Sequence, residues 1–438
     1  MSQLPLTWSS ALLGDLIELN PKNSCDDDVE VGFVPMPCLG TRYLEKLSYE
    51  PRQWRDVKRG YTHFANGDVL LAKITPCFEN GKAGIAQGLP NGIGAGSTEY
   101  FVCRPRSTII DARYLLALFK TEKFIKKGTV QMTGSVGHKR VPKSYVTDTS
   151  IPLAPFAEQQ RIADKLDAVL RRVNACRERL NRTTQMVKDF RRSVLRFPGA
   201  PEHALGQLGQ VSGGLTKNGK RGTLPIVRPY LRVANVYSNE LRLDEVAEIG
   251  MTSAEWEKTR LAPGDLLIVE GNGSIDQIGR LALWGGEIEE CSHQNHLIRW
   301  RAGPDILPKY ILYYLMSATG RQKIVQIASS TTGLHTLSVS KVAGLKIPVP
   351  SMAEQARVVN RIETLLAFAD RLESRLATAR AAVDRLTPAL LAKAFRGELV
   401  PQDPNDEPAP ELLKRLAATR ASAPIPKRRS KAAGTIEN

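Results

Sequence analysis

One box of nine residues occurs twice in this chain and decides its fold. Residues 151–159 read Ile-Pro-Leu-Ala-Pro-Phe-Ala-Glu-Gln, and residues 347–355 read Ile-Pro-Val-Pro-Ser-Met-Ala-Glu-Gln, 196 positions later. Each box opens a long stretch with heptad spacing. Internal repetition is the first feature to test, because it determines the architecture. The repeat predicts one structural unit written twice, with pseudo-two-fold symmetry. Such a chain can present two similar surfaces to a two-fold object such as duplex DNA.

Shorter matches extend the repeat on the N-terminal side of each box. They pair Leu13-Gly14 with Leu205-Gly206, Gly67-Asp68 with Gly264-Asp265, and residues 114–119 with residues 310–315. Between these anchors the two copies differ strongly. That difference is expected of a shared scaffold that carries two different binding surfaces. It is equally expected of drift in an old duplication whose loops have no role.

The length of 438 residues suits two domains of ordinary size plus helices. Short apolar runs bounded by glycine and proline, such as residues 68–72 and 100–103, predict strands. Apolar residues sharing one face predict a helix over residues 112–126. The predicted fold class is therefore mixed α+β. The expected parts are a first domain (1–153), a first helix (154–198), a second domain (199–349), a second helix (350–398) and a Pro-rich basic tail (399–438).

The stretch after each box carries five heptads of apolar residues. In the first stretch they are Ile162, Leu166, Val169, Val173, Cys176, Leu180, Val187, Phe190, Val194 and Phe197, with Thr183 in the one polar slot. In the second they are Val358, Ile362, Leu365, Ala369, Leu372, Leu376, Ala379, Val383, Leu386 and Leu390. This regularity predicts a coiled-coil seam.

Two such helices in one chain most simply pair with each other, antiparallel, as a rod of roughly 50 Å. A zipper between chains is the alternative. Pro388 is expected to kink or end the second helix near Thr387.

The net charge of +16 favours a polyanionic partner, nucleic acid first and an anionic membrane second, although a basic balance can also serve solubility alone. No uninterrupted apolar run is long enough to span a bilayer, and residues 1–8 do not have the pattern of a signal peptide.

The six cysteines lack a CxxC pair and indicate reduced cytosolic thiols. The tail after residue 400 combines prolines with a basic cluster at residues 426–431, and is expected to be mostly disordered.

Motifs for catalysis are missing. There is no Asn/Asp-Pro-Pro-aromatic run for transfer of a methyl group to a base, and no PD…ExK arrangement of a nuclease. Residues 214–220 resemble a phosphate loop, but Arg221 replaces the hydroxyl residue that would hold magnesium. Cys291, His293 and His296 are metal-capable, but a structural zinc site usually brings four ligands in two clusters and no second cluster follows. No metal site is therefore expected.

Polar, Gly-rich stretches on a strand scaffold are the candidates for reading bases. Asn and Gln pair with adenine in the major groove, and Arg and Lys meet guanine or phosphate. The same side chains could instead only hold the backbone of turns. The candidate DNA-binding residues are Lys73, Thr75, Asn80, Lys82, His138, Lys139 and Arg140 in the first domain. In the second they are Arg228, Tyr230, Arg232, Asn235, Asn272, Ser274, Gln277, Arg280, His293, Gln294, Asn295 and His335.

Taken together these features closely resemble the specificity (S) subunits of type I restriction–modification systems, over roughly residues 8 to 400. The carriers of the resemblance are the twin boxes, the 73–82 loop, the stretches 270–280 and 293–296, and the closing Phe395-Arg-Gly-Glu-Leu399. The first helix departs from that closing motif, because it ends in Phe197-Pro198-Gly199.

The resemblance implies that each domain is a target recognition domain that reads one half of a split, asymmetric DNA site. It implies that the helices act as a ruler and dock two methyltransferase (M) subunits, which motor-nuclease (R) subunits can join, in the cytoplasm at the nucleoid. S-adenosylmethionine, ATP and magnesium are expected on those partners and no cofactor on this chain. The residues expected to form the spacer helices and meet partners are Glu158, Gln159, Arg161, Ile162, Leu166, Val173, Leu180, Glu354, Gln355, Arg357, Ile362, Leu365, Leu372 and Leu376.

Three other functions stay open on the sequence. One is an enzyme with degenerate motifs, which predicts catalysis by the purified chain alone. The second is a coiled-coil adaptor that never reads bases, which predicts that changes in the polar loops leave sequence choice untouched. The third is a DNA-reading subunit of a related assembly that is not type I, which neighbouring genes would reveal.

Overall fold

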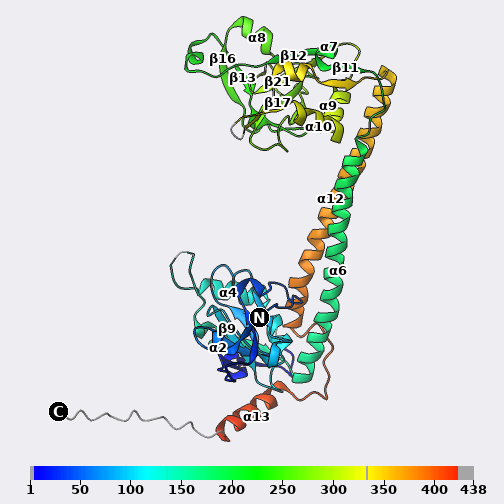
Figure 1. Ribbon diagram of the computed structural model, residues 1–438. Coiled ribbons are helices and arrows are strands. Elements are labelled where there is room, and N and C mark those ends of the chain that lie inside the picture. The colour runs from blue at the N-terminus through cyan, green and yellow to red at the C-terminus, as the bar shows by residue number, and fades with distance from the viewer. Residues whose placement is uncertain (1–3, 136, 332–333, 423–438) are drawn as a thin grey trace, which may run out of the picture. The chain divides into compact units, whose positions relative to one another are not determined.

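The computed structural model describes residues 4–135, 137–331 and 334–422 (Figure 1). Contacts divide the chain into two units. Unit 1 comprises Met1–Leu180 and Ala379–Asn438, and unit 2 comprises Asn181–Thr378. The boundary between the units runs through both long helices. Each unit therefore consists of a globular domain, the start of one long helix and the end of the other. The twice-repeated unit and the mixed α+β class predicted from the sequence are confirmed.

The domain of unit 1 is built on two four-stranded sheets, ordered β2-β9-β6-β7 and β4-β3-β8-β5, with β1 paired to β10. Its strands are β1 (Ser9–Leu12), β2 (Ile17–Leu19), β3 (Glu30–Val34), β4 (Glu50–Gln53), β5 (Thr62–Ala65), β6 (Val69–Ala72), β7 (Ala83–Ile85), β8 (Ile93–Gly96), β9 (Tyr100–Pro105) and β10 (Ser150–Leu153). Its helices are α1 (Leu13–Leu16), α2 (Trp54–Val57), α3 (Ala112–Phe119), α4 (Glu122–Val130) and α5 (Lys143–Asp148).

The domain of unit 2 repeats this plan with the sheet β12-β21-β17-β19, beside the smaller sheets β16-β13-β20, β18-β23-β22, β11-β24 and β14-β15. Its strands are β11 (Glu202–Ala204), β12 (Gly209–Gly213), β13 (Ile226–Leu231), β14 (Val236–Tyr237), β15 (Glu240–Leu241), β16 (Ala247–Met251), β17 (Leu266–Val269), β18 (Gly271–Asn272), β19 (Leu281–Leu283), β20 (Ser292–His293), β21 (Leu297–Ala302), β22 (Ser329–Thr331), β23 (Leu334–Thr336) and β24 (Lys346–Pro348). Its helices are α7 (Leu205–Leu208), α8 (Ser253–Thr259), α9 (Pro308–Met316), α10 (Ala318–Ile327) and α11 (Val339–Ala343).

An ion pair to a buried aspartate holds the central sheet of each domain in the same way. In unit 1 the Nε and Nη2 of Arg104 on β9 donate to the two carboxylate oxygens of Asp68 at 2.8 and 2.9 Å. In unit 2 Arg301 on β21 makes both bonds to Asp265 at 2.7 Å. The glycine before each aspartate has a φ near +90°, a conformation that favours glycine. The Gly-Asp dipeptide that occurs in both copies therefore marks a turn, and its aspartate binds the arginine of the neighbouring strand in the sheet.

Both long helices begin on one domain through a buried glutamine. In unit 1 Gln159 accepts from the backbone N–H of Asp111 at 2.9 Å and donates to the carbonyls of Ile109 and Ala154 at 3.0 and 2.9 Å. Gln355 repeats these three bonds in unit 2 with the N–H of Leu307 and the carbonyls of Asp305 and Pro350. The glutamine of each box therefore attaches helix to domain and does not face a partner.

The two long helices, α6 (Phe156–Val194) and α12 (Met352–Ala394), run alongside each other (Figure 1). In unit 1 the Ile162 end of α6 shares a core with Ala394 of α12, and Arg177 forms an ion pair with Asp384 at 3.0 Å. In unit 2 Arg191 forms ion pairs with Asp370 and Glu373. Numbers rise along one helix as they fall along the other, so the helices pair antiparallel in each unit.

The residues predicted to form the coiled-coil seam differ in how deeply they are buried. Ile162, Leu166, Val173 and Ile362 are buried, and Leu180, Leu365, Leu372 and Leu376 are partly buried. Cys176 and Leu386, which the heptads also include, are exposed, so their assignment to the seam is wrong. The expected end of the second helix near Thr387 is wrong as well, because α12 continues through Pro388 to Ala394. Leu391 and Ala394 are buried in the core of unit 1, and this burial holds the last turns despite the missing N–H.

The remaining box residues also have structural partners. Glu158 is buried and accepts from Trp8 Nε1 at 2.9 Å and from Gln402 Nε2 at 2.6 Å, and burial raises its pKa. Arg161 forms a two-pronged ion pair with Asp406. In unit 2 Glu354 pairs with Arg357 at 2.8 Å on the helix surface.

The tail after residue 399 is folded over most of its described length, which corrects the expectation of disorder for residues 399–422. Gln402 and Asp406 bind the start of α6, and α13 (Ala409–Ser422) follows. Ala409 and Leu416 of α13 are buried in the core of unit 1. The prolines shape an ordered connection, because the apolar residues that follow have a surface to cover. Residues 423–438, with the basic cluster, lie outside the described part of the chain.

We expect Gln159→Ala to destabilise unit 1 by about 2–4 kcal/mol, because it leaves one buried backbone N–H and two carbonyls without their partner. Urea unfolding followed by circular dichroism measures the change. Gln160→Ala, at the exposed neighbouring position, is the matched control and should stay within about 0.5 kcal/mol of wild type. Equal effects of the two substitutions would show that the buried amide does not anchor the helix.

Candidate nucleic-acid interface

Three segments of unit 1 that the sequence singled out meet at one place. The loop after β6 lies beside the start of β9, because Lys73 N donates to Glu99 O at 2.9 Å. It also lies beside the turn before residue 141, because Thr75 N donates to Lys139 O at 2.9 Å and Val141 N donates to Lys73 O at 2.8 Å. The predicted 73–82 loop and the basic turn thus form one surface, with Val136 of that turn outside the described residues.

Arg140 is the centre of this surface. Its Nη2 and Nε donate to the two carboxylate oxygens of Glu99 at 2.8 and 3.0 Å, and its Nη1 donates to His138 O at 3.2 Å. The hydrogen bonds from Arg140 lower the pKa of Glu99. His138, Lys139 and Asn80 are exposed. The surface therefore presents positive and polar side chains that are suited to phosphate or base edges.

Three other predicted residues of this loop make contacts within the protein. Lys82 Nζ donates to Met36 O at 2.8 Å, Lys73 Nζ lies 5.6 Å from the centre of the Phe101 ring, and Thr75 Oγ1 lies 3.9 Å from the sulfur of Met132. Each of these side chains is only partly exposed. Lys82 in particular holds the loop rather than projecting from it.

Unit 2 brings together the corresponding segments. Glu270 N donates to His296 O at 2.9 Å, and Leu337 N donates to Glu270 O at 2.7 Å. The pairing of β18 with β23 places Asn272 opposite His335. Glu270 Oε2 is 3.0 Å from Nδ1 of His296, whose side chain is 58% exposed. Ser274 and Gln277 are exposed on the loop that follows, and Asn272 accepts from Ser274 N at 2.9 Å.

The stretch 293–296 is flanked by the loop of residues 214–220, whose sequence resembles a phosphate loop. Leu215 N donates to His293 O at 2.8 Å and Asn295 N donates to Leu215 O at 2.9 Å, so the loop contacts the stretch at Leu215. Lys217 and Lys220 are exposed on this loop. Buried Arg221 holds it, because its Nη1 donates to Gly250 O at 3.0 Å and its Nη2 to Glu255 at 3.0 Å. Arg221, which replaces the hydroxyl residue of a phosphate loop, thus anchors a loop that carries two exposed lysines.

Three predicted DNA contacts are wrong, because the side chains are buried. Tyr230 and His293 are 1% and 0% exposed, and Asn235 is 3% exposed. The amide of Asn235 accepts from Arg232 N and donates to the carbonyls of Arg242 and Glu245, so it holds a turn. The alternative role of turn support, left open for the polar residues, applies to this asparagine.

The other predicted residues of unit 2 are at least partly accessible. Arg228 forms an ion pair with Glu290 at 2.9 Å, and Arg280 lies 4.9 Å from the Tyr237 ring centre. Arg232, Gln294 and Asn295 are partly exposed. Gln294 N donates to Leu231 O at 2.9 Å, which keeps the backbone of 293–296 between two neighbours. Of these residues, Gln294 and Asn295 lie in the 293–296 stretch itself, next to His296.

Comparison with known proteins identifies the family. The profile of the type I restriction modification DNA specificity domain matches residues 5–183 and again residues 202–378. The chain belongs to this family.

The chain is 51% identical over 161 residues to the Escherichia coli EcoAI specificity subunit, covering 36% of this chain and 27% of that protein. It is 29% identical over 355 residues to the E. coli K12 EcoKI specificity subunit, covering 74% of each. The chain spans 27% of the length of the EcoAI and EcoEI subunits that it matches.

Two solved structures share the fold of this specificity-domain protein. One is described as the structural basis of complex assembly and conformational transition of the type I R-M system; it has a TM-score of 0.71 and 19% identity, covering 90% of this chain and 99% of that chain. The HsdS subunit from Thermoanaerobacter tengcongensis has a TM-score of 0.62 and 19% identity, covering 90% of this chain and 98% of that chain. At this identity the comparison speaks for the fold alone.

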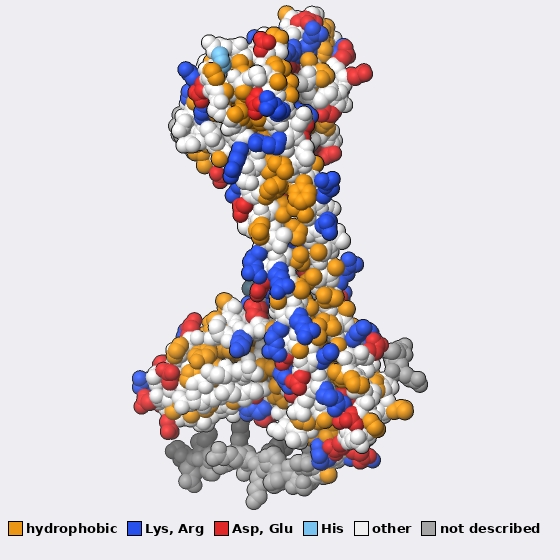
Figure 2. All heavy atoms as spheres, turned by 90° about the vertical axis from the view of Figure 1, so that its right-hand side faces the viewer, with side chains coloured by type: hydrophobic (Ala, Val, Ile, Leu, Met, Phe, Trp, Pro, Cys, Tyr) orange, Lys and Arg blue, Asp and Glu red, His pale blue; other side chains and the backbone are white. Residues whose placement is uncertain are grey.

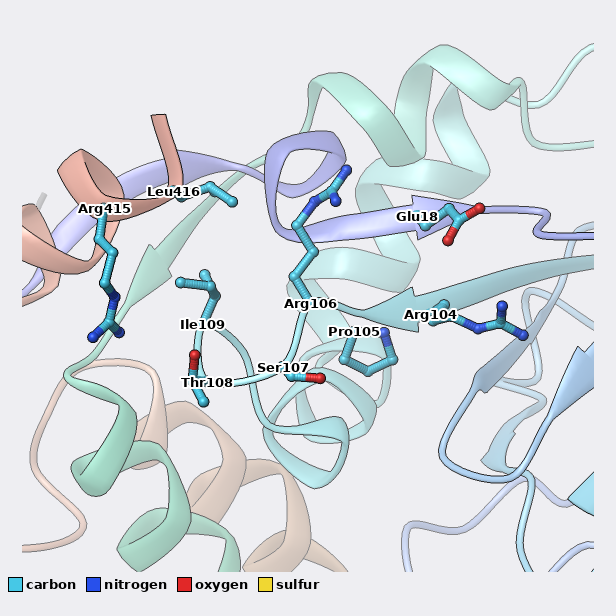
Figure 3. A pocket seen from close by; sticks show the side chains of 9 residues that line it. All are labelled: Glu18, Arg104, Pro105, Arg106, Ser107, Thr108, Ile109, Arg415 and Leu416. Carbon is cyan, nitrogen blue, oxygen red and sulfur yellow. The ribbon is translucent and has the colours of Figure 1, made fainter. Parts of the chain in front are cut away.

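A pocket of about 450 Å³ in unit 1 of the specificity-domain protein lies apart from this surface, between the end of β9 and α13 (Figure 3). Its arginines are already engaged. Arg104 pairs with Asp68, Arg106 Nε donates to Asp15 O at 3.1 Å, and Arg415 forms an ion pair with Glu407 at 3.3 Å. The pocket is therefore a seam between the tail and the domain, and it is not a second candidate site.

Residues 4–135, 137–331 and 334–422 contain no group of three or more His, Cys, Asp or Glu residues that could hold a metal ion. Nor does any helix within those ranges have the length and apolar character needed to cross a membrane.

Acid should destabilise unit 2 through His293. Burial, with the nearby charge of Arg299, lowers the pKa of His293 to about 4. The folded protein keeps the ring neutral while the unfolded chain binds a proton below about pH 6.5, so stability is full above that pH and falls toward pH 4. At pH 5 the loss is about 2 kcal/mol relative to pH 7.5.

Urea unfolding at pH 7.5 and pH 5, followed by fluorescence of the buried Trp284 and Trp300, measures this loss. His293→Gln should show a smaller pH dependence than wild type, and the exposed His138→Gln should match wild type. The same pH dependence in all three proteins would exclude His293 as the cause.

Proposed function

We propose that this chain is the non-catalytic DNA-recognition subunit of a type I restriction–modification complex. In this proposal residues 1–153 and 199–349 are two recognition domains, and each reads one half of a split, asymmetric DNA site. One observation carries the proposal: the two domains share the same internal framework but differ in the charged side chains that this framework presents. A scaffold used twice with two surfaces suits the reading of two different sequences.

The residues that form the shared internal framework are different from the residues that form the proposed DNA-binding surface. Asp68–Arg104 and Gln159 in unit 1 have the same bonds as Asp265–Arg301 and Gln355 in unit 2. Around them the accessible side chains differ. The proposed DNA contacts are Lys73, Thr75, Asn80, His138, Lys139 and Arg140 in unit 1, and Lys217, Lys220, Arg228, Arg232, Asn272, Ser274, Gln277, Arg280, Gln294, Asn295, His296 and His335 in unit 2.

The long helices fix the gap between the half-sites and dock two methyltransferase subunits, to which motor-nuclease subunits add. An exposed apolar patch in unit 2 suits such docking. Met186 is 69% exposed one turn before Phe190 on α6, and the Phe190 ring contacts Phe368 of α12, which is 46% exposed. Figure 2 shows hydrophobic and basic side chains mixed along the helices on the side it displays. S-adenosylmethionine, ATP and magnesium bind to the partners, in the cytoplasm at the nucleoid.

Co-expression with the neighbouring methyltransferase gene, in a host that lacks similar systems, tests this role. We expect new methylation of the host DNA at a split motif, two short sequences separated by a fixed gap, because two recognition domains each select one half. Mapping of modified bases across the host genome measures it. The methyltransferase expressed without this chain is the control and should give no such motif. Methylation by this chain alone would show that it is an enzyme, and a stable complex without new methylation would contradict the reading of bases.

Removing one heptad from both long helices should shorten the gap and leave both half-sequences unchanged. Seven residues of α-helix span about 10 Å, which corresponds to about three base pairs of duplex DNA. The same mapping of modified bases reads the new gap. Removal of whole heptads keeps the apolar faces of the two helices in phase. A gap that stays unchanged would show that the helices do not set it.

A further inference from the structure

The two units place three segments in the same arrangement through the same hydrogen bonds. Lys73 N donates to Glu99 O and Val141 N to Lys73 O in unit 1, just as Glu270 N donates to His296 O and Leu337 N to Glu270 O in unit 2. The residue after β6 therefore corresponds to the residue after β17, and Glu99 corresponds to His296. We call this arrangement the three-segment junction.

Each three-segment junction contains a carboxylate that holds a more exposed nitrogen side chain. In unit 1 Glu99, 24% exposed, holds Arg140, 48% exposed. In unit 2 Glu270, 29% exposed, holds His296, 58% exposed. The carboxylates come from different positions of the junction, since Glu99 corresponds to His296 and Glu270 to Lys73. Both junctions therefore contain a pair of a carboxylate and a nitrogen side chain, although the carboxylate comes from a different segment in each unit. Drift of unused loops does not explain this recurrence.

We propose that Arg140 and His296 each discriminate one base pair, one in each half-site, and that Glu99 and Glu270 are positioning residues that orient them. This inference rests on the proposed function and names the residues that decide sequence choice within it. Because the carboxylates are the more buried members of the two pairs, the nitrogen side chains are the ones that can reach a base edge.

The chemistry of the two pairs differs. The guanidinium of Arg140 has five N–H groups, and Nε, Nη2 and Nη1 each use one of them on Glu99 or His138 O. One N–H remains on each terminal nitrogen, and this pair matches the N7 and O6 acceptors of guanine. A carboxylate only accepts hydrogen bonds, so a neutral His296 whose Nδ1 donates to Glu270 has Nε2 as its single acceptor. That atom suits the exocyclic amino group of adenine or cytosine.

The test uses the full chain co-expressed with its methyltransferase, and maps modified bases for wild type, Arg140→Lys, Glu99→Gln, His296→Phe and Glu270→Gln. We expect Arg140→Lys and Glu99→Gln to relax the same single base pair of one half-site, by about tenfold or more for Arg140→Lys. His296→Phe and Glu270→Gln should relax one base pair of the other half-site. The half-site that is still read shows that each variant is folded, and a merely structural carboxylate would not act on that one base pair.

Lys139→Gln is the matched control next to Arg140, and it should weaken binding to all sequences alike and lower the salt dependence. An unchanged motif in the Arg140 and His296 variants, or equal relaxation of both half-sites, would overturn this inference while wild type still supports the proposed function. A wild-type complex that yields no split motif would overturn the proposed function and this inference with it.

Discussion

The buried amide of a glutamine at the start of each long helix is the interaction on which the rest of the structure depends. Gln159 and Gln355 each satisfy one N–H and two carbonyls from two separate segments of the adjoining unit. A side chain with both donors and an acceptor can do this, and neither glutamate nor leucine can. Because buried polar groups must be paired, the helix has one allowed position on its domain. Domain and helix therefore move as one body at each of these two attachments.

That rigidity leaves the outer loops free to differ. The Asp68–Arg104 pair and its counterpart in unit 2 hold the sheets through residues that lie outside the three-segment junction. Lys73 in one unit and Glu270 in the other follow strands of the same sheet position and have opposite charges. Both side chains are partly exposed, so the position accommodates either sign of charge. Sequence choice can therefore change without a new scaffold.

The sequence predicts the features that recur, and it misses those that depend on local burial. The repeated Glu-Gln boxes and the Gly-Asp turns are identical in both copies, which is why the two-unit architecture could be read directly. His293 was predicted to contact bases because it stands in a polar stretch, but both residues of β20 are buried, and His293 Nδ1 is 3.0 Å from Thr259 O. The fold of residues 399–422 could not be predicted, because its anchors on Glu158 and Arg161 lie about 240 residues away in sequence.

The long helices connect the two domains through both of their ends. α6 starts on the domain of unit 1, and Phe197 just beyond its end packs on Tyr310 of unit 2 with ring centres 5.3 Å apart. α12 starts on the domain of unit 2, and Phe395 beyond its end packs on Tyr114 of unit 1 at 4.9 Å. Each domain is therefore held by the beginning of one helix and the end of the other. A change in the length of a single helix would pull one aromatic contact out of register, so a viable change in spacing must alter both helices together.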